Sequence, residues 1–397
     1  MLEHNCGAGE DYELAAGEAH RWLTGPASAI WLDAGIDRVH GGFFDQISSQ
    51  DGRNAVDFKR LRVTCRQIFV FATLDRFAVP GAREAMRHGL DFLFGPLAHE
   101  DGGYRRSVTL DGKALDDERD LYDLAFVLFA LAAAFERTGD SRLEEAANEL
   151  LGFLHRRMAH GPGGFVEAIP YRLPHRQNPH MHLLEACLAW IPHSRSAAFR
   201  EFAIALIALF TSRFWQAEDS CLLEYFNADW SPVSDPARRI FEPGHHMEWV
   251  WLLGEARKLG LSVPNFDDAL AARARRDGFS PETGLPFGEV RGDGTVADEV
   301  CRIWTVTEWL RVCLACPNVD AGGWREPFGH LKVFLDTPIK GLWREKCNAR
   351  TYVFDQGAVP ASSLYHIVSG LLPMLAPQFL TPNVNQDTSL GSLTSNV

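Results

Sequence analysis

The sequence predicts an all-α fold, an (α/α)6 barrel in which six helical hairpins close into a toroid, with short β-hairpin loops at one mouth. Two observations predict it. A glycine–aromatic segment recurs along the chain, and two helical stretches separate consecutive copies. Gly42, Gly103 and Gly164 stand 61 residues apart, a period that indicates one supersecondary unit used repeatedly. The copies cover residues 41–53, 102–113, 163–172, 222–232, 284–295 and 341–351.

The stretches between the copies have helical periodicity, with apolar residues at three- and four-residue steps. The first stretch after each copy is expected to line the inside of the ring: 58–78, 119–138, 177–193, 241–260, 299–315 and 361–376. The second is expected on the outside: 81–98, 141–159, 196–215, 264–277 and 322–337, with 13–31 completing the last pair. The first and last helical stretches are apolar enough to complete each other, which favours a closed toroid over an open solenoid.

Composition is that of a globular protein with a large core, at 46% hydrophobic and 23% charged residues. We expect one catalytic domain over 1–380 and a polar, flexible tail over 381–397. A net charge of −13 disfavours nucleic acid and anionic membranes as partners. The N-terminus lacks the pattern of a signal peptide, and the apolar runs are too short to span a bilayer. The sequence therefore predicts a cytoplasmic protein.

The eight cysteines show no framework spacing, which is typical of reduced thiols. Cys313 and Cys316 form a lone CxxC within an apolar helical stretch. A zinc site would need a second ligand pair, and a redox motif would need a thioredoxin-like context. We therefore interpret these two residues as core thiols.

The segment RIFEPGHHMEWVWL (239–252) holds the densest cluster of reactive side chains. Pro243 suits the first position of a helix, because the first turn needs no proline N–H. His245 then lies in the first turn, and Glu248 follows at i+3 on the same face. The positive end of the helix dipole disfavours a protonated imidazole there, so a neutral His245 is expected.

The inner helices should run parallel, so that their N-terminal turns meet at one mouth. Asn178 is a favoured N-cap and Pro179 a favoured first residue, which places His182 and Glu185 on one face and His180 elsewhere. Other inner helices offer Arg62, Arg66, Asp123, Arg302, Glu308 and Tyr365. We expect the mouth to gather His182, His245, His366, Glu185, Glu248, Arg66, Tyr122, Trp249 and Trp304.

Aromatic faces beside charged and amide groups are what a sugar requires, because its C–H faces are apolar and its hydroxyls need hydrogen bonds. Other chemistries remain open. A metal site would have only two ligands from His245 and Glu248, with His182 as a possible third. A glycan hydrolase would need two of the carboxylates Asp123, Glu242, Glu248 and Glu308 and leaves the histidines unexplained. A non-catalytic repeat scaffold would bury this polar cluster at a cost.

Several segments resemble the N-acylglucosamine 2-epimerase superfamily. They are RQNPHMHLLEA (176–186), EPGHHMEWVWLL (242–253), LYHI (364–367), YDLAF (122–126) and TCRQ (64–67), and the similarity covers nearly the whole chain. The NPHMHLLEA form is most similar to the bacterial aldose–ketose isomerases that act on mannose and related sugars. The resemblance implies an (α/α)6 barrel that needs no metal and no redox cofactor.

The resemblance places the acid/base pair on His245 and His366. It places sugar-binding roles on Arg66, Tyr122, Asn178, His182, Glu248 and Trp304. It implies interconversion of D-mannose and D-fructose, and of related sugars such as lyxose and xylulose, through a cis-enediol. A monosaccharide is then the partner, and the enzyme is a monomer or homodimer. Epimerisation at C2 of glucose, cellobiose or N-acetylglucosamine remains the alternative. Leu124 departs from the family pattern, which often has histidine there, and loosens the inference about substrate.

Overall fold

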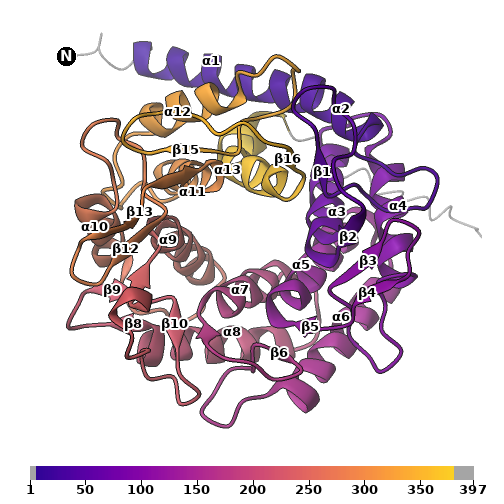
Figure 1. Cartoon of the computed structure of the whole chain (residues 1–397), viewed down its shortest axis with the longest axis horizontal. Coiled ribbons are helices and arrows are strands. Elements are labelled where there is room, and N and C mark those ends of the chain that lie inside the picture. Colours follow the sequence, from indigo (N-terminus) through magenta and orange to yellow (C-terminus); the bar gives the residue numbers. More distant parts are fainter. Residues whose placement is uncertain (1–5, 380–397) are drawn as a thin grey trace, which may run out of the picture.

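The computed structural model describes residues 6–379 and shows two concentric rings of helices (Figure 1). Within that range the inner ring comprises α3 (Leu61–Arg76), α5 (Leu121–Thr138), α7 (Asn178–Trp190), α9 (Pro243–Lys258), α11 (Ile303–Ala315) and α13 (Ser362–Phe379). The outer ring comprises α1 (Cys6–Trp22), α4 (Ala82–Phe94), α6 (Ser141–Phe153), α8 (Ala198–Leu209), α10 (Asp267–Asp277) and α12 (Arg325–Leu335). This is the (α/α)6 barrel that the sequence predicts.

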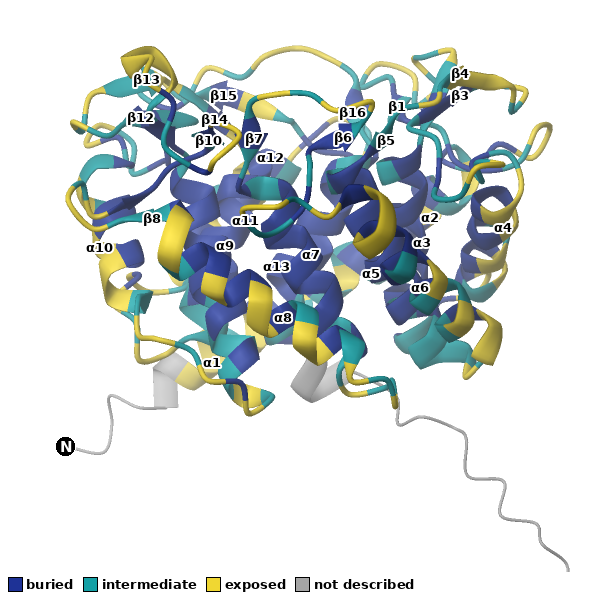
Figure 2. Cartoon of the chain, turned by 90° about the horizontal axis from the view of Figure 1, so that it is seen from below, coloured by how far each residue is buried: buried dark blue, intermediate teal, exposed yellow. Residues whose placement is uncertain are grey.

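The ring closes where the two ends of the chain meet. The last inner helix, α13, packs against α11 on one side and α3 on the other, and α1 lies outside it. Inner helices are buried on nearly every face because they are packed between the lumen and the outer ring (Figure 2). Outer helices bury one stripe and expose the opposite face to solvent.

Several outer helices are not α-helical throughout their expected ranges. After α6 and α8 the chain continues through π-helical turns at Leu154–Met158 and Phe210–Phe214. The stretch expected at 13–31 is α1, a π turn at Leu23–Ala27 that contains Pro26, and α2 (Ser28–Asp33). Proline lacks the N–H that would continue the α-helical ladder, which accounts for the interruption.

Short strands gather at one end of the barrel (Figure 2). Those that directly precede the inner helices are β2 (Phe58–Arg60), β5 (Arg119–Asp120), β7 (His175–Arg176), β11 (Ile240–Phe241), β14 (Val300–Arg302) and β16 (Val359–Pro360). They pair antiparallel with β3 (Ser107–Thr109), β6 (Ala168–Ile169), β10 (Tyr225–Phe226), β12 (Glu289–Arg291), β15 (Lys346–Asn348) and β1 (Gln46–Ile47), respectively.

The pairing of β16 with β1 joins the last loop to the first, so the mouth is closed as the helical ring is. The remaining strands extend these sheets or form a hairpin: β4 (Ala114–Asp116), β8 (Trp215–Gln216), β9 (Cys221–Leu222) and β13 (Val296–Asp298). Each inner helix therefore begins from a strand that is fixed to the next loop. This brings all the N-terminal turns of the inner helices to one end of the barrel, as the sequence predicts.

The 61-residue period has a structural cause. Gly42, Gly103 and Gly164 all adopt positive φ angles, of 72°, 73° and 67°. A Cβ at Gly42 or Gly164 would also lie 2.7 Å from the side chain of Phe92 or Leu209 on the outer ring. Both constraints select glycine, because other residues pay for positive φ and for the close approach.

Two further observations concern composition. Among the described residues, none of the helices combines the length and apolar character that crossing a lipid bilayer requires. The cysteines whose side chains are described are all free thiols, including Cys313 and Cys316, which are half-buried. The tail expected at 381–397 lies outside the described residues.

The closure of the ring depends on close contact between α11 and α13. A Cβ at Gly370 on α13 would lie 2.8 Å from the carbonyl oxygen of Thr307 on α11. We predict that Gly370→Ala lowers the free energy of unfolding by about 1–3 kcal/mol, because backbone must shift to admit the methyl group. Gly329→Ala on α12 is the matched control, since nothing lies within 4 Å of its added Cβ. Thermal unfolding of both variants checks this, and equal melting temperatures would contradict it.

Candidate active site

Each inner helix contributes at least one polar or aromatic side chain to a ring at the level of its first turns. These residues are Arg66 on α3, Tyr122 on α5, His182 on α7, His245 and Glu248 on α9, Trp304 on α11 and His366 on α13. The sequence-predicted residues therefore come from every inner helix. Two arcs of contacts connect most of them.

The first arc is centred on Trp304. Its ring centroid lies 5.0 Å from that of His245 and 5.6 Å from that of His366. The indole packs against the backbone of α9 at Gly244, where a Cβ would come within 2.5 Å of the ring. The two histidines therefore flank one aromatic face.

The second arc is centred on Arg66. Its Nη2 donates a hydrogen bond of 2.7 Å to the hydroxyl of Tyr122, and its Nη1 donates to the carbonyl of Ser362, which opens α13. The Tyr122 ring in turn lies edge-on to His182, with centroids 5.0 Å apart. The Nε of Arg66 is buried and has no hydrogen-bond partner among the described residues. This guanidinium therefore has one buried N–H that no described protein group accepts.

His245 lies in an acidic environment. Its Nδ1 is 2.9 Å from Oε1 of Glu224 and 3.8 Å from Oε1 of Glu242. Burial alone would lower the pKa of the imidazole, but the charges of Glu224 and Glu242 outweigh it and raise the pKa to about 10. The neutral His245 expected from the helix dipole is therefore wrong, because two carboxylates at hydrogen-bond or ion-pair distance act more strongly than a helix end.

His366 has the opposite environment. Its Nδ1 lies 2.8 Å from Oε1 of Glu308, yet burial and then the positive charge of Arg66 lower its pKa well below the ordinary value. Burial raises the pKa of Glu308 to about 7. With the carboxylate as acceptor, Nδ1 carries the proton and Nε2 keeps a lone pair. His366 is therefore a neutral imidazole near neutral pH.

His182 is paired with a carboxylate on its own helix, as the i, i+3 spacing predicts. Its Nδ1 lies 3.1 Å from Oε2 of Glu185 and 3.6 Å from Oε1 of Glu248. Burial lowers the pKa of His182 to about 4. His180 faces away from the ring and accepts a hydrogen bond from the backbone N–H of Phe165, also as expected.

Glu248 does not orient His245, as the i+3 spacing suggested, because Glu224 occupies that position. Both carboxyl oxygens of Glu248 are buried without a hydrogen-bond partner among the described residues. Burial, together with the charges of Glu308 and Glu185, raises the pKa of Glu248 well above its ordinary value. A protonated carboxyl group can both donate and accept, which suits a sugar hydroxyl.

Two other sequence interpretations need correction. Trp249 is not in the ring: it is fully buried, stacks on Phe210 at 4.3 Å, and donates through Nε1 to Oε1 of Gln177. Asn178 is not the N-cap of α7, because the helix begins at Asn178 itself and Gln177 holds the cap position. The side-chain oxygen of Asn178 is buried and unpartnered among the described residues, one turn above His182.

Sequence reasoning missed Glu224 and Gln177. The Nε2 of Gln177 donates to both oxygens of Glu224, at 3.2 and 3.0 Å, so a chain of contacts runs from Trp249 through Gln177 and Glu224 to His245. The sequence does contain a signal for Glu224, because an acidic residue recurs at the same position in several copies of the repeated segment. The backbone carbonyls of Asp45, Glu167, Glu224 and Glu345 each accept an N–H at the start of an inner helix.

Two groups of residues within the described chain have the spacing of metal ligands. One is His182, Glu185 and Glu248, and the other is Glu224, Glu242 and His245. In the second group the imidazole has a raised pKa, and a protonated imidazole offers no lone pair to a metal. In the first group the Nδ1 of His182 lies at hydrogen-bond distance from Glu185.

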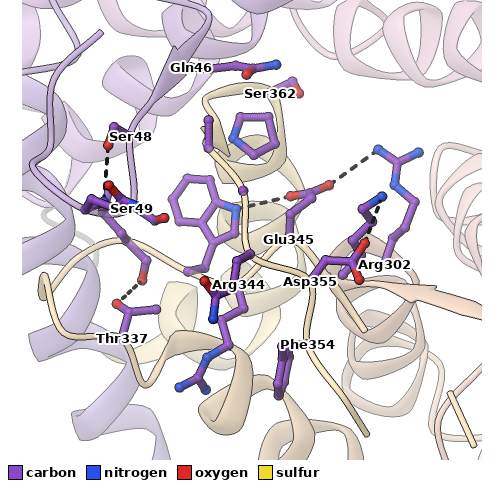
Figure 3. A pocket seen from close by; sticks show the side chains of 18 of the residues that line it. Gln46, Ser48, Ser49, Arg302, Thr337, Arg344, Glu345, Phe354, Asp355 and Ser362 are labelled. Atoms are coloured by element: carbon purple, nitrogen blue, oxygen red, sulfur yellow. Dashed lines mark hydrogen bonds and ion pairs between the residues drawn. The ribbon is translucent and has the colours of Figure 1, made fainter. Parts of the chain in front are cut away.

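A cavity of about 1490 Å³ opens beside the ring at the same mouth. Its lining includes Arg302, which precedes α11, and Ser362, which opens α13. Figure 3 shows Arg302 reaching Glu345 on the cavity wall, a contact of 3.4 Å. The histidines and Trp304 are not part of the lining. The cavity is therefore a space next to the ring, on the side where α13 begins.

Comparison with known proteins places the chain in a family. A family model described as N-acylglucosamine 2-epimerase (GlcNAc 2-epimerase) matches residues 42–370. The chain is 34% identical to a mannose-6-phosphate isomerase of Rhizobium meliloti (strain 1021), over 91% of this chain and 97% of that protein. It is 27% identical to a D-mannose isomerase of Thermobifida fusca, over 82% of this chain and 92% of that protein.

The fold has the same relatives. A cellobiose 2-epimerase structure from Spirochaeta thermophila DSM 6192 matches with a TM-score of 0.80 at 24% identity, over 92% of this chain and 97% of that chain. Since the family model covers most of the chain, the assignment does not depend on any one relative. The chain is therefore an enzyme of the N-acylglucosamine 2-epimerase family, a family of sugar isomerases and epimerases.

Proposed function

We propose that this enzyme is an aldose–ketose isomerase that interconverts D-mannose and D-fructose, and related sugars such as lyxose and xylulose, without a metal ion. The observation that carries the proposal is the pair of imidazoles flanking Trp304. Their pKa values are shifted in opposite directions, upward for His245 and downward for His366. Two titratable groups held apart in this way are suited to serve as an acid and a base at the same pH.

The chemistry requires both partners. His245, in its protonated form, donates a proton to the ring oxygen of the bound sugar as the bond from that oxygen to C1 breaks. It then takes the proton of the O1 hydroxyl, which leaves the open-chain aldehyde and returns His245 to its protonated form. His366, through the lone pair on Nε2, removes the proton from C2 of the open-chain aldose and leaves a cis-enediolate. The same imidazole then returns the proton to C1, while His245 moves a proton between O1 and O2. The product is the ketose, and both histidines end as they began.

The rest of the ring supports binding of the sugar. Trp304 offers an aromatic face for the C–H side of the pyranose, and Glu248 and Asn178 offer unpartnered oxygens to hydroxyl groups. Arg66 offers its free Nε–H to the oxygen that becomes negative in the enediolate. Tyr122 and His182 then form the wall opposite Trp304.

The first prediction concerns the two histidines. With mannose in D2O containing EDTA, the wild-type enzyme should form fructose and incorporate deuterium. His366→Asn or His245→Asn should lower kcat at least about a hundredfold, the usual worth of acid/base catalysis. Product chromatography and NMR of the sugars measure both outcomes.

His246→Asn is the matched control for these variants, because His246 is also buried on α9 but contacts the backbone of Leu222 and Leu270 outside the ring. Its kcat should stay within about threefold of the wild-type value, since no proton-transfer group is lost. If the wild-type enzyme forms no fructose and exchanges no deuterium, the proposal is overturned.

Epimerisation at C2 is the alternative outcome of the same experiment. Two histidines beside one indole would also permit removal of the C2 proton by one imidazole and its return to the other face of C2 from the second. The family and the cellobiose 2-epimerase neighbour support this alternative. Deuterium found at C2 of an epimer, rather than at C1 of a ketose, would select it.

The second prediction concerns the charge on His245. Glu224→Gln should lower the pKa of His245 from about 10, because it removes the nearer of two carboxylates. Since the folded-state pKa exceeds the ordinary 6.5, protonated His245 stabilises the fold below that pH, and the stabilisation is lost as pH rises through about 10. Ring NMR titration measures the shift. Glu167→Gln, at the equivalent loop position, should leave the pKa of His245 unchanged.

The third prediction concerns the charge on the sugar. Two arginines at the mouth are held by carboxylates: the partly buried Arg62 lies 2.7 Å from Asp123, and the exposed Arg302 lies 3.4 Å from Glu345 on the cavity wall. A phosphate would have to displace such a carboxylate or stand beside Glu242. We therefore expect kcat/KM for mannose to exceed that for mannose 6-phosphate by at least about tenfold, which corresponds to about 1.4 kcal/mol. A higher value for the phosphate would contradict the neutral-sugar assignment.

A further inference from the structure

A buried guanidinium lies below the histidine ring. Arg311 stands on α11, one turn below Glu308, and is buried although it is charged. Its Nη1 lies 3.4 Å from Oε2 of Glu308, and its Nη2 lies 3.5 Å from Oε1 of Glu185 on α7. The guanidinium carbon stacks 3.2 Å from the centre of the Trp251 ring, which holds the plane of the group.

Each of these carboxylates uses its other oxygen on a histidine of the ring. Glu308 contacts Nδ1 of His366 through Oε1, and Glu185 contacts Nδ1 of His182 through Oε2. The hydroxyl of Tyr365 donates a further hydrogen bond of 2.6 Å to the same oxygen of Glu185. One cation therefore connects two separate carboxylate–histidine pairs, across α7, α11 and α13.

We infer that Arg311 is a positioning residue that fixes His182 and His366 together, through Glu185 and Glu308. It acts by favouring the ionised form of both carboxylates and by holding them toward the Nδ1 atoms, so that each imidazole presents Nε2 to the sugar. This inference rests on the proposed function for its kinetic consequence, but its structural consequence is measurable without substrate.

The charges around Glu308 make the dependence specific. Glu185 on α7 adds negative charge near Glu308, while His245 on α9 and Arg311 on its own helix offset it. The neighbouring carboxyl of Glu248 on α9 has a raised pKa and adds little charge. His366 on α13 also neighbours Glu308, and its imidazole carries no charge near neutral pH because its pKa is lowered. Without Arg311, Glu185 and Glu308 would face each other with one fewer cation, and Glu308 would bind a proton at higher pH. A protonated Glu308 no longer fixes the tautomer of His366.

Arg311→Gln tests the inference, with Arg311→Lys as the conservative variant. For mannose isomerisation, kcat should fall about tenfold or more in Arg311→Gln, as expected when a catalytic base loses its orientation, with KM within about threefold. The pH at which kcat reaches half its plateau on the acid side should rise by about one unit, because Glu308 must be ionised. Arg311→Lys should recover most of kcat, since it restores the charge.

Ring ¹⁵N NMR of histidine, without sugar, gives the independent readout. His366→Asn and His182→Asn assign the two signals. In the wild-type enzyme we expect both rings as the Nδ1–H tautomer, and in Arg311→Gln both should become tautomer mixtures. Arg273→Gln is the matched control: Arg273 is also buried, stacks on Phe241 and pairs with one carboxylate, Asp277, on the outer ring. It should lower the melting temperature without moving the pH profile or the two signals.

The outcomes separate the two claims. Unchanged tautomers and an unchanged acid side of the pH profile in folded Arg311→Gln would overturn the role of Arg311, whatever the activity. If Arg311→Gln and Arg273→Gln change the tautomers and the pH profile equally, the role of Arg311 is also overturned, because the effect would then be general to buried guanidinium groups. If the wild-type enzyme is inactive on sugars but the histidine tautomers still change in Arg311→Gln, the proposed function is overturned and the role of Arg311 is supported.

Discussion

The structure depends on one interaction made in two electrostatic settings: a buried histidine Nδ1 at hydrogen-bond distance from a buried carboxylate. His245 makes it with Glu224 and His366 makes it with Glu308. On the α9 side further carboxylates surround the contact, so the proton stays on the imidazole. On the α13 side burial, together with the positive charge of Arg66, lowers the pKa of the imidazole, so it stays neutral. Trp304 stands between the two settings.

The closed barrel offsets the unfavourable free energy of burying these charged groups. Burying several carboxylates in one lumen raises their pKa values, as for Glu242 and Glu308, both to about 7. Such burial is unfavourable unless each charge finds a partner. The closed ring supplies partners from neighbouring helices and loops, since Gln177 holds Glu224 and Arg311 holds Glu308. A wall open on one side would leave some of these groups unpaired.

Much of the fold could be predicted from the sequence. The glycine spacing and the helical periodicity predict the pairs of helices, and the Pro243 start fixes His245 and Glu248 in the first turns of α9. The helix-start argument also finds His182, His366 and Trp304. These predictions succeed because they rest on local chemistry: a proline, a short periodicity or a glycine at positive φ.

The misses come from contacts that no local pattern encodes. Trp249 was placed in the ring because α9 is buried on nearly every side, so its periodicity does not show which face meets the lumen. Glu224 lies in a loop 21 residues before His245, and only the register of β7 with β10 brings it there beside Gln177. The charge on His245 followed from that missed contact, which outweighs the helix dipole.

A crystal structure of the enzyme with a linear hexitol, the reduced form of the open-chain sugar, tests the central claim most directly. The account predicts that the C1–C2 end lies between the imidazoles of His245 and His366, with the carbon chain against Trp304. A hexitol bound in the cavity beside Glu345, with neither imidazole within hydrogen-bond distance of C1–C2 oxygens, would contradict it.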